Sequence, residues 1–350
     1  MPDGWHPRGA RELRFGLVGL GAMGRNHLRV LSEVAGIRLV AIADPVPTLV
    51  EASSARTAAR GMTDARSMIA EEDLDAIVIA APTTAHRELT IAAVERGIPV
   101  LVEKPLAATI EDATAILTAS RKAGVPVAVG HIERFNPAVR ELGRLIRDGW
   151  LSTVYAIASR RSGPFPERIR DVGVTIDLAT HDVDILSWIA GERPARVYAE
   201  TAQRIHAEHE DLLFGLLHFP SGTVAQLDVD WLTPVKRRQL VVVGEEGMFE
   251  LDYLSQRLTF TRATDMTNPR LISGYAPTFE GDVVEMAVGN GEPLALELEA
   301  FVDVVRRGGR PEVEVEDGLW AVAIATALLE AATVREVVAL PDPLASLGAR

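Results

Sequence analysis

The sequence of 350 residues contains no cysteine. This absence excludes disulfide bonds, cysteine-ligated zinc, iron–sulfur clusters and thiol nucleophiles together. Basic residues are also fewer than acidic ones. The sequence has 36 lysines and arginines and 49 aspartates and glutamates, which gives a formal net charge of −13. Proteins that bind nucleic acids or anionic membranes carry basic faces, so this charge balance argues against both kinds of partner.

Long apolar runs are lacking as well. No uninterrupted run approaches the ~18 residues that a helix needs to cross a bilayer. The segment from Met1 to Arg14 is polar and lacks the apolar centre of a signal peptide. We therefore predict a soluble cytoplasmic protein, and the hydrophobic content of 47% is ample for two domain cores.

A glycine-rich turn is the most informative feature of the N-terminal region. An apolar stretch beginning at Phe15 leads into a G-x-G-x-x-G spacing, and a helical pattern follows. A dinucleotide site requires this order, because the glycines allow a tight turn, close approach of a pyrophosphate and close packing of helix on strand. Free N–H groups at the helix N-terminus then favour an anion. The predicted cofactor contacts of this turn are Gly19, Gly21, Ala22, Met23 and Gly24.

A second predicted strand, residues 37–43, ends at Asp44. An acidic side chain about 20 residues after the glycine turn can accept both ribose hydroxyls and repel a 2′-phosphate, which favours NAD over NADP. No basic residue follows Asp44 until Arg56, which also favours NAD. The alternative is that Asp44 and Pro45 only open a turn and cap the next helix.

Strands and helices alternate from residue 15 to 130, which predicts an α/β fold with a doubly wound parallel sheet. Ligands bind beyond the carboxyl ends of such strands. Ala81, Pro82 and Thr83 follow one strand end, with Thr83 or Thr84 as a helix cap, and Glu103 and Lys104 follow another. The Glu103–Lys104 sequence could also be a solvated ion pair that ends its strand. We further expect helices at 47–60, 64–70 and from 111, and strands at 74–81, 98–102 and 125–130.

The pattern changes after residue 131. An amphipathic helix at 134–147 precedes strands that alternate apolar with polar residues, as in a mainly antiparallel sheet with one solvated or ligand-facing side. We predict a first domain at 12–131 and a second, α/β domain at 132–340. The expected strands are 154–158, 195–201, 211–219, 223–231, 239–243 and 248–254, and late helices are expected at 297–307 and 317–338.

A predicted helix at 174–188 carries Asp177 and His181 at positions i and i+4, on one face. Histidine titrates near neutral pH and a carboxylate can fix its tautomer, which suits a general acid/base. With Asp184 the two could instead ligate a metal, which nicotinamide chemistry does not need. They could also be a helix-start residue and a satisfied interior histidine.

Several arginines precede this helix and flank a Gly-Pro turn. Guanidinium groups suit a diphosphate, so these residues are candidates for an anionic substrate. The alternative is a solvated loop that offsets the acidic charge of the protein. The arginines are Arg160, Arg161, Arg168 and Arg170.

Together these segments resemble the Gfo/Idh/MocA family of sugar oxidoreductases, from about residue 13 to 335. The motifs that carry the resemblance are Gly19 to Gly24, Asp44-Pro45, Ala81 to Thr83 with His86, Glu103-Lys-Pro105 and Asp177-x-x-x-His181. The resemblance implies an N-terminal Rossmann domain and a C-terminal domain whose open sheet often mediates oligomers. It also implies that Lys104, Asp177 and His181 form the catalytic group.

A narrower resemblance, to UDP-N-acetylglucosamine 3-dehydrogenases, rests on Gly130 to Pro137 and on Asp171 to His181. It implies oxidation of the C3 hydroxyl of a nucleotide sugar, with a homodimer or homotetramer expected. An inositol or free-sugar dehydrogenase is the nearest alternative, and a non-catalytic NAD-binding regulator is the alternative from another class. Further expected cofactor contacts are His86, Glu103, Lys104 and Arg134, and expected substrate contacts are Lys104, Asn136, Arg161, Asp177 and His181.

Overall fold

The structure, a computed structural model, describes residues 5–166, 172–263 and 282–345. The chain forms two compact units, Met1–Phe135 with Glu292–Ala323, and Asn136–Gly291 with Ile324–Arg350. The late segment 292–323 therefore belongs to the first unit, although the sequence analysis assigned it to the second domain. Helix α8 (Pro293–Arg307) explains the difference, because its apolar side chains join the core of the first unit.

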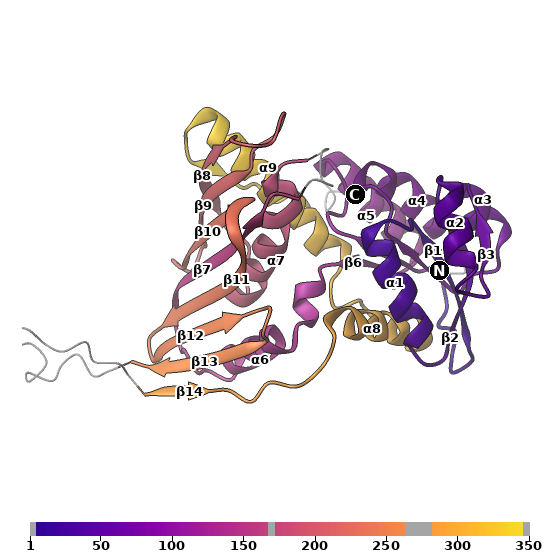
Figure 1. The fold of residues 1–350 in the computed structure, drawn as a ribbon. Coiled ribbons are helices and arrows are strands. Elements are labelled where there is room, and N and C mark those ends of the chain that lie inside the picture. The colour runs from indigo at the N-terminus through magenta and orange to yellow at the C-terminus, as the bar shows by residue number, and fades with distance from the viewer. Residues whose placement is uncertain (1–4, 167–171, 264–281, 346–350) are drawn as a thin grey trace, which may run out of the picture. The chain divides into compact units, whose positions relative to one another are not determined.

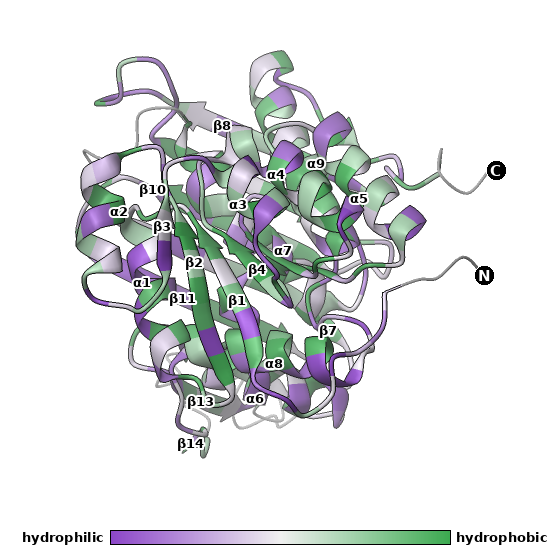
Figure 2. Ribbon diagram, turned by 90° about the vertical axis from the view of Figure 1, so that its right-hand side faces the viewer, coloured by the Kyte–Doolittle hydropathy of each residue, from purple (hydrophilic) through white to green (hydrophobic). Residues whose placement is uncertain are grey.

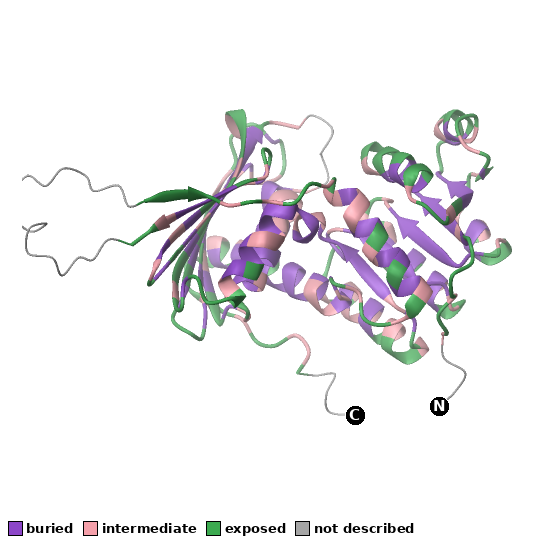
Figure 3. Ribbon diagram, turned by 90° about the horizontal axis from the view of Figure 1, so that it is seen from below, coloured by how far each residue is buried: buried purple, intermediate pink, exposed green. Residues whose placement is uncertain are grey.

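The first unit contains a six-stranded parallel sheet in the order β3-β2-β1-β4-β5-β6. The strand order reverses between β1 and β4, as in a doubly wound Rossmann fold, which confirms the predicted fold of this region. The central strands are strongly apolar in Figure 2 and buried in Figure 3. The strands are β1 Leu13–Val18, β2 Ile37–Ala43, β3 Arg60–Met62, β4 Ala76–Ile79, β5 Val100–Glu103 and β6 Val127–Gly130.

Helices pack on this sheet (Figure 1). Helix α8 lies against α1 and completes the core, where the ring of Phe301 meets the ring of Phe15 edge-on with centroids 6.1 Å apart. The other helices of the unit are α1 Ala22–Glu33, α2 Pro47–Ser54, α3 Ala65–Glu71, α4 Thr83–Glu95, α5 Ile110–Ala123 and the 3₁₀ helix η1 Ile132–Phe135.

Two local predictions in this unit are wrong. The helix expected at 47–60 ends at Ser54, and residues 60–62 form edge strand β3, which pairs with residues 41–43 of β2. Backbone pairing at the sheet edge outweighs the helix propensity of the alanine-rich segment. Helix α4 begins after Pro82 without a side-chain cap, so neither Thr83 nor Thr84 has the predicted capping role.

The second unit contains a nine-stranded sheet in the order β14-β13-β12-β11-β7-β10-β9-β8-β15. Among its described strands only β10 and β7 pair in parallel, which confirms the mainly antiparallel sheet. Helices α6 Pro137–Arg147 and α7 Thr180–Ala190 pack against it. Its strands are β7 Val154–Pro164, β8 Arg196–Ala202, β9 Leu212–His218, β10 Val224–Asp230, β11 Leu232–Gly244, β12 Gly247–Asp252, β13 Arg257–Arg262, β14 Val283–Glu285 and β15 Val338–Ala339.

The two faces of this sheet differ in exposure. Residues that pair across β9, β10, β7 and β11 share a face, and one such row of partners is Leu217, Ala225, Ile157 and Val242, all buried. The opposite face carries exposed apolar side chains, which we call the outer apolar face. Its members are Phe214, Leu216, Val224 and Val243, exposed by 47%, 48%, 40% and 36%.

Helix α9 (Val315–Val334) is long and apolar enough to cross a membrane by length and composition alone. Charged residues interrupt its apolar sequence, so the search for an unbroken apolar run did not find it. In the structure 61% of its most apolar window is buried inside the protein. Core helices of soluble proteins pass the same composition test, and this extent of burial is typical of them.

Candidate cofactor and catalytic site

The glycine turn joins β1 to α1 as the sequence predicted. Gly19 has φ +86°, in the left-handed region, and a side chain there would lie 2.4 Å from the carbonyl oxygen of Ala80. A side chain at Gly24 would lie 1.9 Å from the Gly19 oxygen, so this glycine brings α1 onto the turn. A Cβ at Gly21 would meet no described atom within 4 Å. The space beside Gly21 is therefore open for a ligand to approach the backbone.

Helix α1 begins at this turn with Gly21 as its N-cap. No side chain of the described residues caps it, and its first turn holds no acidic residue. Its first N–H groups and the positive end of its dipole can therefore receive an anion. An open glycine cradle and an uncapped helix N-terminus fit the pyrophosphate of a dinucleotide.

Asp44 follows β2 directly beside this turn and is 7% exposed. Its Oδ2 accepts a hydrogen bond from the Leu20 N–H at 2.7 Å, and its Oδ1 accepts from the Val46 N–H at 2.9 Å. The carboxylate is thus fixed at the carboxyl edge of the sheet, and each oxygen keeps a second lone pair. This position suits the predicted acceptor of ribose hydroxyls.

His86 of α4 lies in the protein interior. The ring is 1% exposed, and its two nitrogens lie 2.9 Å from the carbonyl oxygens of Ala81 and Pro105. Burial, the main influence, holds the pKa of His86 below its usual value against the effect of both carbonyls. The ring therefore connects the segments after β4 and β5, and its contact with the cofactor stays a prediction.

Glu103 also faces the protein interior. Its Oε1 lies 2.7 Å from Nε2 of His27, and its Oε2 accepts the Lys104 N–H at 3.2 Å. Burial, the largest influence, raises the pKa of Glu103, but the His27 hydrogen bond and the attraction of His27 and Lys104 together lower it. Glu103 is therefore an ionised support beside half-buried Lys104, and its contact with the cofactor stays a prediction.

Asp177 and His181 lie in the second unit on one continuous helical segment. Asp177 belongs to a π-helical turn, Thr175–Ala179, which leads into α7. Both side chains are half-buried, whereas Ala179, Thr180 and the residues from Asp182 to Ser187 are buried. The pair thus shares the accessible stripe of this helix, and π-turns inside helices are frequent at functional sites.

Arg161 of β7 is buried and committed to an internal partner. Its Nε donates to Oδ2 of Asp182 at 2.7 Å, and the guanidinium lies 5.4 Å from the ring centre of Tyr253. The Ser159 hydroxyl donates to the other oxygen of Asp182 at 2.6 Å. The charge of Arg161 is thus balanced inside the unit, and its role in holding a diphosphate stays a prediction. Arg160 binds Asp228 at 3.1 Å, and Arg168 and Arg170 lie outside the described residues.

Arg134 and Asn136 are likewise held by the protein. Arg134 forms a two-pronged ion pair with Asp317 at 3.1 and 3.2 Å, both within the first unit. Asn136 caps α6 through the Ala138 N–H and donates its amide to the Tyr253 carbonyl at 3.1 Å. These partners give both residues structural roles, and their contacts with the cofactor and the sugar stay predictions.

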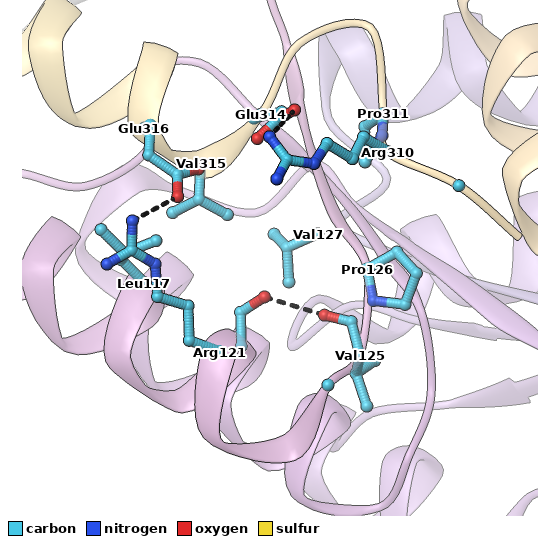
Figure 4. Close-up of a pocket in the computed structure, with 13 residues that line it drawn as sticks. Leu117, Arg121, Val125, Pro126, Val127, Arg310, Pro311, Glu314, Val315 and Glu316 are labelled. Atoms are coloured by element: carbon cyan, nitrogen blue, oxygen red, sulfur yellow. Dashed lines mark hydrogen bonds and ion pairs between the residues drawn. The ribbon is translucent and has the colours of Figure 1, made fainter. Parts of the chain in front are cut away.

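A pocket of about 420 Å³ lies at the opposite edge of the first unit's sheet, where β6 begins (Figure 4). Ion pairs between Arg121 and Glu316 and between Arg310 and Glu314 border it. Dinucleotides bind at the carboxyl edge, so this pocket is separate from the candidate cofactor site. In the part of the chain that the structure describes, no group of three potential metal ligands gathers.

Two family models match the chain. The oxidoreductase family model for the NAD-binding Rossmann fold matches residues 13–131, and the Gfo/Idh/MocA C-terminal domain model matches residues 139–250. The chain therefore belongs to the Gfo/Idh/MocA family of oxidoreductases, and its first unit is an NAD-binding Rossmann domain.

Curated relatives include dehydrogenases with different substrates. Inositol 2-dehydrogenase 2 of Saccharopolyspora erythraea is 30% identical over 224 residues, 62% of this chain and 66% of that protein. UDP-N-acetylglucosamine 3-dehydrogenase of Acidithiobacillus ferrooxidans is 25% identical over 294 residues, 84% of this chain and 89% of that protein.

Solved structures share the fold over nearly the whole chain. The WlbA dehydrogenase of Bordetella pertussis, crystallised with NADH and UDP-GlcNAcA, matches with a TM-score of 0.82 and 25% identity. The match covers 96% of this chain and 99% of that one.

The glycine turn provides a first test of the cofactor site. Gly21→Ala should leave the thermal unfolding temperature nearly unchanged, since its Cβ meets open space, but weaken NADH binding by about tenfold or more through the lost approach of the pyrophosphate. Gly24→Ala should lower both the thermal unfolding temperature and the affinity for NADH, because its Cβ overlaps the Gly19 oxygen. Fluorescence titration with NADH and calorimetry measure the two effects. Unchanged NADH affinity in Gly21→Ala would place the pyrophosphate elsewhere.

The ion pair of Arg161 provides a second test. Arg161→Ala leaves the buried Asp182 carboxylate without its partner, so we expect a loss of about 3–5 kcal/mol in the free energy of unfolding. Arg160 is exposed, so Arg160→Ala should lower the free energy of unfolding by less than about 1 kcal/mol. Urea unfolding measures both, and the double variant Arg161→Met/Asp182→Leu should recover most of the loss. If Arg161→Ala unfolded like the wild type, the internal role of Arg161 would be refuted.

Proposed function

We propose that this protein is an NAD-dependent dehydrogenase that oxidises a secondary hydroxyl of a sugar, with C3 of a UDP-N-acetylhexosamine as the first candidate. The glycine cradle with Asp44 carries the cofactor assignment. The UDP-N-acetylglucosamine 3-dehydrogenase relative, aligned over 89% of its own length, supports the choice of sugar. The WlbA structure, solved with a UDP-sugar acid, supports the same substrate class.

The proposed chemistry gives a role to each residue of the predicted catalytic group. His181 accepts the hydroxyl proton as the adjacent carbon loses a hydride, and Asp177 holds the imidazole in the required tautomer. The ammonium group of Lys104 stabilises the negative charge that develops on the oxygen. NAD, when bound, supplies the hydride acceptor, so that the alcohol becomes a ketone and one proton is released.

A polyol or unactivated sugar is the second candidate substrate. The burial of Arg161 against Asp182 favours it, because this ion pair already balances the charge of the arginine inside the unit. The inositol 2-dehydrogenase relative points the same way, although it is aligned over only 66% of its own length.

The first experiment is a turnover assay by NADH absorbance with NAD and UDP-N-acetylglucosamine, N-acetylglucosamine or myo-inositol. We expect turnover with the nucleotide sugar. Lys104→Ala and His181→Ala should each reduce kcat by about 10²–10⁴-fold through loss of charge stabilisation and of the base. Lys122→Ala, on the exposed end of α5, is the matched control and should keep wild-type turnover.

The outcomes separate the candidates. Turnover with inositol or the free sugar alone would replace the substrate and keep the family chemistry. NAD binding without turnover of any sugar in a broad panel would favour a non-catalytic regulator. Near-native turnover in both Lys104→Ala and His181→Ala would remove the proposed catalytic group.

We also propose that the outer apolar face mediates self-association into a dimer or tetramer, because soluble monomers seldom leave such a sheet face exposed. Leu216→Glu, in the middle of β9, should convert the oligomer to monomers by placing a charge in the interface. Val46→Glu, exposed by 45% in the first unit, is the control and should not. Size-exclusion chromatography with light scattering measures the mass. A monomeric wild type would contradict this proposal.

A further inference from the structure

Glu297 is a buried acid that the proposed chemistry does not use. It lies on α8, is 2% exposed, and has neighbours Leu294, Leu298 and Phe301 in the apolar core. Neither carboxyl oxygen of Glu297 has a hydrogen-bond partner among the described residues. A carboxylate buried without donors or a cation is strongly disfavoured, so such a group retains its proton. Glu297 is therefore an uncharged carboxylic acid.

The packing of α8 places Glu297 on the same face of the sheet as Glu103. Glu297 lines a cavity of about 10 Å³ together with Leu101 of β5 and Ala128 of β6. Leu101 and Glu103 are two residues apart on one strand, so their side chains point to the same face. A cavity of this size holds about one water molecule, which could bridge buried polar groups.

Gly130 makes room for the Glu103 carboxyl group. It pairs with Glu103 across β5 and β6, and a Cβ there would lie 3.1 Å from the Glu103 Cα and 3.2 Å from its Oε2. The carboxylate is thus confined between His27, the Lys104 N–H and the β6 backbone.

The charge that acts on Glu297 is that of Glu103. Burial is the main reason that the pKa of Glu297 lies well above its usual value, and the negative charge of Glu103 adds to it. Arg134 of η1 is occupied by Asp317. The other titratable groups on elements that pack around α8 are Arg25, His27, Arg29 and Glu33 of α1, Lys104 after β5, His131 after β6, Glu133 of η1 and Glu312 before α9.

We propose that Glu297 is a positioning residue that stays uncharged near Glu103, so that the two buried acids carry one negative charge between them and the Glu103 carboxylate keeps its place next to Lys104. Two ionised carboxylates at close range repel each other, and one of them remains protonated. A single negative charge balances the Lys104 ammonium group. A second would oppose the alkoxide that Lys104 stabilises in the proposed reaction.

This arrangement has a defined pH dependence. Because the folded state raises the pKa of Glu297, it binds this proton more tightly than the unfolded chain. The resulting stabilisation is complete below the usual glutamate pKa and is lost as pH rises through the raised value. Loss of the proton also places the second negative charge beside Glu103.

The experiment compares wild type with Glu297→Gln, which keeps shape but cannot ionise, and with Glu299→Gln, an exposed change on the same helix. Infrared difference spectra of wild type minus Glu297→Gln at pH 8 should contain the carbonyl stretch of a protonated carboxylic acid, shifted in D₂O. The spectrum of wild type minus Glu299→Gln should lack it. This measurement needs neither NAD nor a sugar, so it remains decisive if the proposed substrate is wrong.

A second measurement tests positioning rather than structure alone. The chain has three lysines, Lys104, Lys122 and Lys236, so acetylation of Lys104 can be followed by mass spectrometry relative to Lys122. In wild type the relative rate should fall several-fold at alkaline pH, where ionised Glu297 adds negative charge that holds the ammonium form. This fall in the relative acetylation rate should be absent in Glu297→Gln and present in Glu299→Gln.

Thermal unfolding from pH 5 to pH 9 completes the test. The unfolding temperature of wild type should fall relative to that of Glu297→Gln as pH rises, whereas Glu299→Gln should follow wild type. An absent acid band, or unfolding curves of Glu297→Gln that run parallel to wild type at every pH, would show that Glu297 is ionised. An unchanged pH profile of Lys104 acetylation in Glu297→Gln would show that Glu297 does not act on this lysine.

Discussion

The contact between Gly19 and Gly24 is the constraint on which the cofactor edge depends. Since a side chain at Gly24 would lie 1.9 Å from the Gly19 oxygen, only a glycine allows α1 to start directly on the turn after β1. The helix N-terminus is thereby fixed at the carboxyl edge of the sheet, where its N–H groups can receive a pyrophosphate. The Asp44 carboxylate is fixed to the same turn by its bond from Leu20.

Pairing of buried charge is the second recurring feature. Arg134 with Asp317 and Arg161 with Asp182 are each enclosed within one unit. In a poorly polarisable interior an unpaired charge is very unfavourable, so such residues take protein partners before ligands. Glu297 is the exception, because the charge that acts on it, that of Glu103, has the same sign, and loss of its own charge resolves the conflict.

The first unit is completed by chain that arrives late in the sequence. After β6 the chain forms most of the second unit and returns as α8, whose side chains fill the core beside β1 and α1. The support behind the Glu103–Lys104 strand end therefore includes a residue nearly 200 positions away, Glu297. A sequence window around the motif cannot contain this information.

The sequence alone determined the Rossmann order of strand, glycine turn and helix, the acid after β2 and the antiparallel second sheet, because these follow from local periodicity and backbone sterics. It also located the half-buried residues Lys104, Asp177 and His181. An acid at position 297, within the apolar spacing of Leu294, Leu298 and Phe301, was a signal that the sequence analysis missed. Only the tertiary structure decided which arginines are internal, why residues 60–62 are a strand, and that α8 joins the first unit. Those outcomes depend on contacts between segments that are distant in the sequence. A local sequence pattern does not specify which distant segment a residue will contact.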